Sequence, residues 1–516
     1  MIALAAGLLA AAKSKPPAPP PQPPPASQAK VERGADGWRA DLTLDRPILG
    51  WAFPRGRDGH RTLFLLTGPP RESKEQIAAA ACAVRKPVEG AEHDARLYRW
   101  RFESPERLEA LEGGLPEGSL DAVDLEGDGE EELILQRDGG IDRISFGADG
   151  GATVGSLVRD AALGASHGGP RIAWDAAAAG DGKLRVPLLG EFRTYGPASD
   201  GGAAPMSEIA VPVRVDAGPE LFRVKSPSVL TVGRVATGRT VFATEPESLG
   251  KRRLRTLLLD PDGPAESRVV ESWALFPEPE RMMDRDFTLL RGSPVLIVTT
   301  TSAEKLSLLG EKALRIYPLG GDRTRAGDDP IFAATTGINL WQEARPTIID
   351  LDKDGQDDLV LAYWKGLKSA IAALEIYRGT AGGGFGKARS MSFDVEDGKK
   401  GFLEFGADAD GDGRPDVVLL AGSELLVFPG TPAEQAAEKP VASRPSRRIA
   451  MPSDLGSSGS TELNLDLGGV SVSRKRGFGT PSLLDIDGDG RPEVVFAGED
   501  GTGVGRVTIV FVRGPR

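Results

Sequence analysis

The sequence predicts an all-β protein, and three observations carry that prediction. The 516 residues include 66 glycines and 40 prolines, which favour turns and interrupt helices. Apolar residues recur in short runs of strand length or at every second position, as in RPTIID, DLVLAYW, ALEIYRG and RVTIVFV. A motif that ends in such a run recurs along the chain. Together these features indicate many short strands joined by turns.

The repeated motif has four strong copies, which read DLEGDGEEELIL from Asp124, DLDKDGQDDLVL from Asp350, DADGDGRPDVVL from Asp408 and DIDGDGRPEVVF from Asp485. Each copy has acids at positions 1, 3, 5 and 9, glycine at position 6 and an apolar run from position 10. Such crowding of like charge is unfavourable unless a cation lies between the carboxylates, and alternate side chains of a tight turn converge on one point. The motif therefore predicts a site for a hard divalent cation, followed by a strand.

Weaker copies extend the array. The interval from the first strong copy to the second is about four times the next interval, which predicts further units inside it. Traces of them lie at 178–189, 227–244 and 288–300, and the middle one aligns without gaps on 481–498. Because that copy has lost all its acids but keeps its apolar positions, the repeat is first a unit of architecture. A similar trace at 55–68 suggests one more unit.

Units of about 55–75 residues with about four short strands each cannot bury both faces of their own sheet. A radial arrangement buries both faces and leaves few exposed edges. We therefore expect a single monomeric β-propeller over residues 31–516, with seven blades, or eight if the trace at 55–68 is a complete unit. Short helices are predicted at 73–85 and at 104–113, the second with Ser104 as its N-cap.

The N-terminal residues differ in composition from the rest. Residues 2–12 are uncharged and end in three alanines, which predicts a signal peptide over 1–14, although no basic residue precedes the run. The proline-rich segment at 15–30 predicts an extended linker. The apolar run is too short to span a bilayer, so no transmembrane segment is expected in the mature chain. The expected location is the periplasm or the extracellular space.

Composition and motifs exclude several other functions. The formal charge of −12 argues against nucleic acid as a partner. Cys82 is the single cysteine, so neither a disulfide framework nor a thiolate metal cluster is possible. The glycine-rich stretch at 379–389 lacks residues that a phosphate-binding loop requires, and the three histidines have no zinc-like spacing. No catalytic residue and no organic cofactor are predicted.

Two segments closely match a known repeat pattern: FGADADGDGRPDVVLLAG from Phe405 and FGTPSLLDIDGDGRPEVVFAG from Phe478. The sequence thus resembles FG-GAP or VCBS repeat proteins, the β-propeller family that includes the head of the integrin α subunit. In that family the loop between the first two strands of a blade binds calcium. The resemblance implies integrin-like Asp-rich loops that bind up to four Ca²⁺ ions.

By this resemblance, positions 1, 3, 5 and 9 supply side-chain ligands and position 7 a backbone carbonyl. The implied sets are Asp124, Glu126, Asp128, Glu130 and Glu132; Asp350, Asp352, Asp354, Gln356 and Asp358; Asp408, Asp410, Asp412, Arg414 and Asp416; and Asp485, Asp487, Asp489, Arg491 and Glu493. Glutamate at position 3 sets the first loop apart. An EF-hand is excluded, because position 12 is apolar in all four copies.

Alternatives remain for the motif and for the function. Asp-Gly segments also form plain hairpin turns, which need no ion. The preferred function is a non-enzymatic interaction or adhesion scaffold whose partner is an unidentified protein or polysaccharide. A lectin-like carbohydrate binder and a polysaccharide lyase or hydrolase are the alternatives, because propellers host many activities.

Overall fold

The computed structural model describes residues 27–512 with gaps, of which the longest are 69–93, 161–183 and 211–228. In this part of the chain the structure is all β apart from the short helix α2 (Ala433–Ala436), so the all-β prediction is confirmed. The predicted signal peptide, most of the proline-rich linker and the predicted helix at 73–85 lie outside the described residues. The first strand begins at Gln28, just before the predicted boundary at residue 31.

The strands form antiparallel sheets in which successive strands of the chain lie side by side. The sheets of the first half, each named hereafter by its strands, are β3 (Ile48–Ala52), β4 (Thr62–Thr67), β5 (Ala95–Arg101) and β6 (Leu108–Leu115); β7 (Ser119–Val123), β8 (Glu132–Arg137), β9 (Gly140–Phe146) and β10 (Ala152–Arg159); β11 (Leu184–Leu188), β12 (Glu191–Pro197) and β13 (Ala203–Ala210); and β14 (Val229–Val235), β15 (Gly238–Thr244), β16 (Arg253–Leu259) and β17 (Val269–Leu275).

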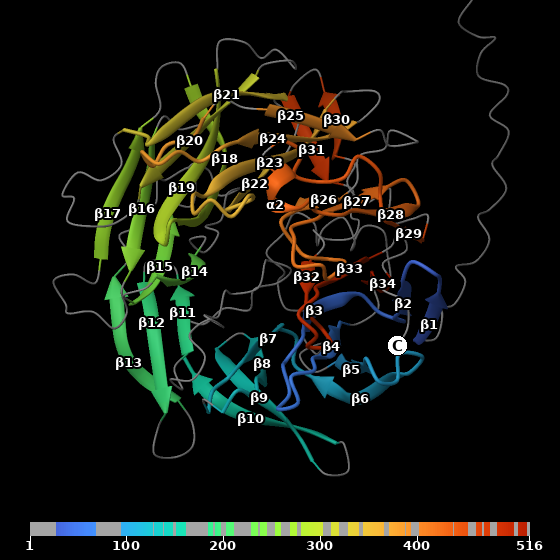
Figure 1. The fold of residues 1–516 in the computed structure, drawn as a ribbon. Helices are drawn as coiled ribbons and strands as arrows, with labels where there is room; N and C mark the ends of the chain where they lie inside the picture. Colours follow the sequence, from blue (N-terminus) through green and yellow to red (C-terminus); the bar gives the residue numbers. More distant parts are fainter. Residues whose placement is uncertain are drawn as a thin grey trace, which may run out of the picture.

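The second half continues this pattern. Its sheets are β18 (Glu280–Leu290), β19 (Ser293–Ser302), β20 (Glu311–Pro318) and β21 (Phe332–Asn339); β22 (Ala344–Ile349), β23 (Asp358–Lys365), β24 (Ile371–Tyr377) and β25 (Arg389–Phe393); β26 (Leu403–Phe405), β27 (Val417–Ala421), β28 (Glu424–Phe428) and β29 (Arg447–Ala450); and the hairpin β30 (Thr461–Asp466) and β31 (Gly469–Arg474). Figure 1 shows the sheets following one another around the molecule.

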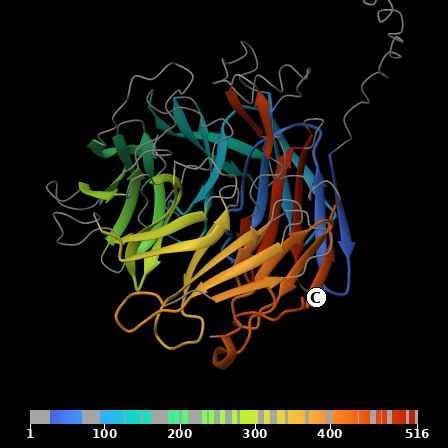
Figure 2. The ribbon, with the colours of Figure 1, turned by 90° about the horizontal axis from the view of Figure 1, so that it is seen from above.

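A final sheet joins the two ends of the chain. It has the order β1-β2-β34-β33-β32, with β1 (Gln28–Arg33) and β2 (Trp38–Thr43) from the N-terminus and β32 (Ser482–Leu484), β33 (Glu493–Glu499) and β34 (Gly505–Phe511) from the C-terminus. Strand β2 pairs antiparallel with β34 from Trp38↔Phe511 to Thr43↔Arg506. Figure 2 shows the N-terminal strands in blue beside the C-terminal strands in red. The described chain thus contains eight sheets of three to five strands and one separate hairpin.

Each middle strand contributes to two hydrophobic cores. In β23, Val360, Ala362 and Trp364 pack toward the β26–β29 sheet, whereas Leu359, Leu361 and Tyr363 pack toward the β18–β21 sheet. Successive residues of a strand point to opposite faces, so a strand between two cores is apolar at every position. This explains the continuous apolar runs in the sequence.

The cores give the order of the sheets in space. They lie between β18–β21 and β22–β25, between β22–β25 and β26–β29, between β26–β29 and the sheet that joins the termini, and between that sheet and β3–β6. Two more lie between β3–β6 and β7–β10 and between β7–β10 and β11–β13. The first strands of consecutive sheets are also neighbours, with β3 beside β7, β14 beside β18, β18 beside β22 and β22 beside β26. From β18–β21 through the sheet that joins the termini to β11–β13, consecutive sheets are therefore packed face to face.

The prediction of a helix at 104–113 is wrong. Residues Leu108–Leu115 form β6, which pairs along β5, and Ser104 lies in the turn between the two strands. The buried Trp100 ring donates from Nε1 to the Pro105 carbonyl at 2.9 Å, and Arg99 pairs with Glu109 at 2.7 Å. These contacts between strands outweigh a local helical preference, which is only a weak determinant of structure.

Candidate metal centres

The four acidic loops occupy the same place in their sheets. Each joins an edge strand, which we count as the first strand of its sheet, to the strand beside it: 124–131 between β7 and β8, 350–357 between β22 and β23, 406–416 between β26 and β27, and 485–492 between β32 and β33. Three of the weaker copies follow the same rule, because 55–68 contains most of the β3–β4 loop, 227–244 the β14–β15 hairpin and 288–300 the turn from β18 to β19. The copy at 178–189 contains β11, and its first six residues lie outside the described part of the chain. The sequence repeat therefore marks one recurring connection.

All four loops share one network of backbone hydrogen bonds. The aspartate at position 1 accepts the N–H of the glycine at position 6 at 2.9 to 3.0 Å, and the acid at position 5 accepts the N–H of position 7 at 2.8 to 3.0 Å. The acid at position 9 accepts the N–H of position 2 at 2.7 to 3.2 Å. Three of the four acids in each loop thus shape the backbone, as aspartates do in tight turns.

The glycine at position 6 permits the reversal of the chain. Its φ is positive in every loop, at 88° for Gly129, 81° for Gly355, 81° for Gly413 and 85° for Gly490. In this region a Cβ atom is strained, so glycine is the default residue. The reversal returns position 9 to the start of the loop, where it meets position 2.

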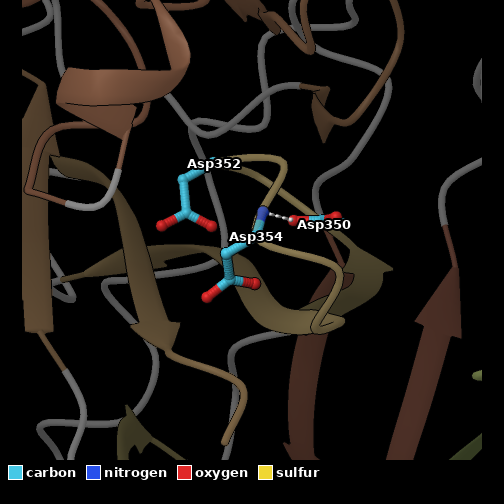
Figure 3. A group of neighbouring side chains, drawn as sticks. All are labelled: Asp350, Asp352 and Asp354. Atoms are coloured by element: carbon cyan, nitrogen blue, oxygen red, sulfur yellow. Dashed lines mark hydrogen bonds between the residues drawn. The ribbon is translucent and has the colours of Figure 1, made fainter. Parts of the chain in front are cut away.

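Three of the loops bring carboxylates together. Carboxylate oxygens lie within 4.8 Å of one another in the groups Asp350, Asp352 and Asp354; Asp408, Asp410 and Asp416; and Asp485, Asp487 and Glu493. Figure 3 shows the first group, in which Asp350 accepts the N–H of Asp354 at 3.1 Å. Of the implied ligands, Asp358, Asp412 and Asp489 lie outside these groups. The backbone N–H groups of Gln356, Arg414 and Arg491 donate to the acid at position 5.

The donor set fits a hard divalent cation. The Oδ1 atoms of Asp352 and Asp485 are buried and accept no hydrogen bond within the described part of the chain. A buried carboxylate oxygen without a partner is costly, and a cation between the acids would satisfy it. Calcium prefers six to eight oxygen ligands, whereas zinc and copper sites use nitrogen or sulfur. Residues at positions 1, 3 and 5 or 9 would hold the ion.

Burial raises the pKa of the acid at position 9. Removal from water raises the pKa of Glu493 to about 8, helped by the nearby Asp485 charge, and that of Asp416 to about 7, helped by the Asp410 charge. Burial also raises the pKa of Asp358 and of Glu132. Without a cation, Asp416 and Glu493 therefore retain a proton to higher pH than an exposed carboxyl, and a bound cation would displace that proton.

We expect the metal-free protein to lose stability as the pH rises. A carboxyl with a raised pKa contributes stability below its unfolded pKa, and this contribution is lost as pH rises through the folded value. For Asp416 and Glu493 the window runs from 3.8 and 4.5 to about 7 and 8. The loss is about 1.4 kcal/mol for each pH unit by which a pKa is raised.

The measurement is thermal unfolding of metal-free wild type and Glu493→Gln across this range. Glutamine keeps an oxygen that can accept the Ile486 N–H but does not titrate. The free energy of unfolding of wild type minus that of Glu493→Gln should therefore fall as pH rises. A difference that is constant with pH would contradict the raised pKa of Glu493.

The loop at 124–131 differs from the other three. Arg143 pairs with Glu126 at 2.9 Å and with Glu132 at 3.1 Å, and Arg57 pairs with Asp128 at 2.7 Å and with Glu130 at 2.8 Å. These arginines neutralise the acids of this loop. No group of three ligand atoms forms there among the described residues.

The loops of neighbouring sheets contact one another. The Arg61 N–H donates to the Ile486 carbonyl at 2.7 Å, and the Arg291 N–H donates to Asp357 at 2.5 Å. The Arg491 side chain packs against Gly411 of the preceding acidic loop. The first-to-second-strand loops therefore lie at a common end of the packed sheets.

Sequence reasoning missed the arginines that face the loops. Arg143 lies in β9 and Arg378 just after β24, each well beyond the motif that it contacts. No signal in the motif identifies them, since one lies within the third strand of its sheet and the other just after it. Of the three histidines, His60 lies in the β3–β4 loop, whereas His93 and His167 lie outside the described residues.

Residues 350–419 match the family model of the FG-GAP-like repeat. No curated protein matches the chain. Among solved structures, dihydro-heme d1 dehydrogenase NirN is similar with a TM-score of 0.41 and 12% identity, over 85% of this chain and 75% of that one. Polysaccharide lyase Uly1 has a TM-score of 0.34 and 8% identity over 87% and 88%, and the periplasmic gluconolactonase PpgL of Pseudomonas aeruginosa 0.31 and 14% over 83% and 97%. These TM-scores support no conclusion about activity.

The matched segment begins with the acidic loop after β22 and ends in β27, so it contains the acidic loops at both 350–357 and 406–416. Both loops share the hydrogen bond from the position-6 glycine to the position-1 aspartate at 2.9 Å and a glycine φ of 81°. The chain therefore carries an FG-GAP-like repeat at residues 350–419, in agreement with the resemblance read from its motifs.

Proposed function

We propose that this chain is an eight-bladed β-propeller that binds calcium in its acidic loops and acts as a non-enzymatic interaction scaffold outside the cytoplasm. The observation that carries the proposal is the convergence of three carboxylates in each of three loops. The propeller is supported by eight sheets of three to five strands, most of them packed against the next sheet of the chain, and by the pairing of β2 with β34.

Calcium would supply charge neutralisation and fixed loop geometry, because it replaces the repulsion between carboxylates by attraction. The acidic loops lie at one end of the sheets. The conformation in which calcium fixes them would therefore set the shape of that surface. Calcium sites of extracellular modules have dissociation constants of about 10⁻⁴–10⁻³ M, a range that suits an exported protein. The apolar segment 2–12 and the proline-rich segment 15–30 favour export.

A scaffold of this kind binds a protein or a polysaccharide through loops held by a rigid framework. None of the helices in the described part of the chain is long and apolar enough to cross a membrane. The carboxylates of the acidic loops accept backbone hydrogen bonds and would bind the proposed ions. We therefore assign them a structural role rather than a catalytic one.

We expect the calcium-loaded protein to leave polysaccharides intact. The measurement is release of reducing ends and of unsaturated sugars from a panel of neutral and acidic polysaccharides, with a polysaccharide lyase as positive control. A parallel glycan array tests for binding. Release that is abolished in Asp410→Asn would contradict the non-enzymatic assignment, and retention of sugars without cleavage would identify the lectin-like alternative.

A further inference from the structure

One arginine lies against three acids of the 350–358 segment. Arg378 follows β24 and pairs through Nη2 with Asp352 and, at 3.4 Å, with Asp354. Its Nε lies 3.3 Å from Oδ1 of Asp358. A single guanidinium therefore contacts positions 3, 5 and 9 of the motif. Its side chain is 27% exposed, so solvent screens these pairs only in part.

The neighbouring sheet provides an internal comparison. Gly379 donates its N–H to Asp358 at 2.7 Å, and Gly430 donates to Asp416 at 2.8 Å. These matching bonds place Arg378 and Pro429, the residues before the two glycines, at the same position of their sheets. Within the described residues no basic side chain lies in salt-bridge distance of the group Asp408, Asp410 and Asp416.

The loop at 124–131 repeats the arrangement with arginine. Arg143, from the third strand of its sheet, pairs with Glu126 at position 3 and Glu132 at position 9. Two of the acidic loops thus receive an arginine from their own third strand or from the residue after it. Arg143 lies within β9 opposite Ile134, whereas Arg378 directly follows β24, at the position that Pro429 occupies after β28. Arginine stays charged at all physiological pH values, so it neutralises carboxylates permanently.

We propose that Arg378 is a built-in counter-ion of the 350–358 segment that opposes calcium there, so that the 406–416 loop binds calcium more tightly. This inference rests on the proposed calcium binding. A guanidinium and a divalent cation repel each other and compete for Asp352 and Asp354. Calcium must therefore displace Arg378 from Asp352 to enter this loop. In the loop beside Pro429 the ion pair of Arg414 is with Asp412, which lies outside the group Asp408, Asp410 and Asp416, so calcium can enter that group without displacing a paired charge.

Two exchanges test the proposal. Arg378→Gln removes the charge and keeps a polar side chain of similar reach, and Pro429→Arg introduces the charge at the matched position. The control is Arg345→Gln, because Arg345 pairs with Glu404, which belongs to none of the three acidic groups. Each protein is titrated with calcium by calorimetry and melted in metal-free buffer and in excess calcium. Circular dichroism checks folding before each titration.

For Arg378→Gln we expect one calcium site to tighten by about tenfold or more, since one competing charge is removed. The melting temperature should fall in metal-free buffer and recover with calcium. Pro429→Arg should weaken one site, and the control should leave all sites unchanged.

Two comparisons separate the inference from the proposed function. Calcium uptake by wild type tests the calcium sites, whereas the difference between the variants and wild type tests the role of Arg378. If wild type takes up calcium and both exchange variants keep its calcium affinities, the inference is overturned while the proposed function stands. A third variant, Arg378→Lys, keeps the charge and should keep the wild-type calcium affinity if Arg378→Gln fails to fold.

Discussion

Replacement of Trp38 by alanine is expected to lower the free energy of unfolding by about 3–5 kcal/mol, the usual cost of truncating a buried aromatic side chain. Trp38 is 5% exposed and stacks on Phe511 with ring centroids 3.9 Å apart and planes 1° from parallel. Phe102 packs against both rings. Because Trp38 lies in β2 and Phe511 in β34, this cluster holds the N-terminal strands to the C-terminal ones.

The control is Trp364→Ala, which removes a similarly buried side chain, 7% exposed, from the core between β22–β25 and β26–β29. Denaturant unfolding measures stability, and hydrogen exchange locates the weakened region. Both variants should be destabilised, but only Trp38→Ala should selectively deprotect β2 and β34. A loss below about 1 kcal/mol for Trp38→Ala, or equal deprotection in both variants, would contradict closure through these strands.

The second large effect is expected from Asp410→Asn, with opposite signs in the two conditions. In metal-free buffer the variant should equal or exceed wild type in stability, because burial and the charges of Asp412 and Asp408 raise the pKa of Asp410. Asparagine keeps an oxygen to accept the Asp412 N–H, a bond of 3.2 Å. With calcium the variant should lose most of one site's contribution, about 2.7 kcal/mol when calcium is in hundredfold excess over its Kd.

Thermal unfolding in both buffers measures this reversal. Glu126→Gln serves as the matched control, since Glu126 occupies position 3 of the loop whose acids pair with Arg57 and Arg143. It should change stability by a similar small amount with and without calcium. If the two variants show the same change in melting temperature on addition of calcium, the result would count against a distinct ion site at Asp410.

Local patterns in the sequence predicted the acidic loops and the strands that follow them. The acids at positions 5 and 9 recur because each accepts a hydrogen bond from a backbone N–H of the loop. The glycine at position 6 recurs because the loop requires a positive φ there. Runs such as DLVLAYWK in β23 are apolar throughout because both faces are buried, so they identify middle strands.

Contacts between distant residues could not be predicted in this way. The pairing of β2 with β34 joins residues more than 400 positions apart, and nothing in the local pattern of Trp38 indicates Phe511 as its neighbour. The position of Arg378 over Asp352 depends on how β24 ends relative to β22. The segment 104–113 has a helical pattern, yet pairing with β5 makes it a strand.

The most direct test of calcium binding is calorimetric titration of metal-free wild type with calcium, followed by thermal unfolding of the same samples. The structure predicts uptake of at least two ions per chain, at the groups containing Asp410 and Asp487, and a melting temperature that rises with calcium and falls again with excess chelator. If the titration shows no calcium uptake and the chelator leaves the melting temperature unchanged, the acidic loops are turns held by backbone hydrogen bonds alone. The proposal of a calcium-binding scaffold would then be wrong.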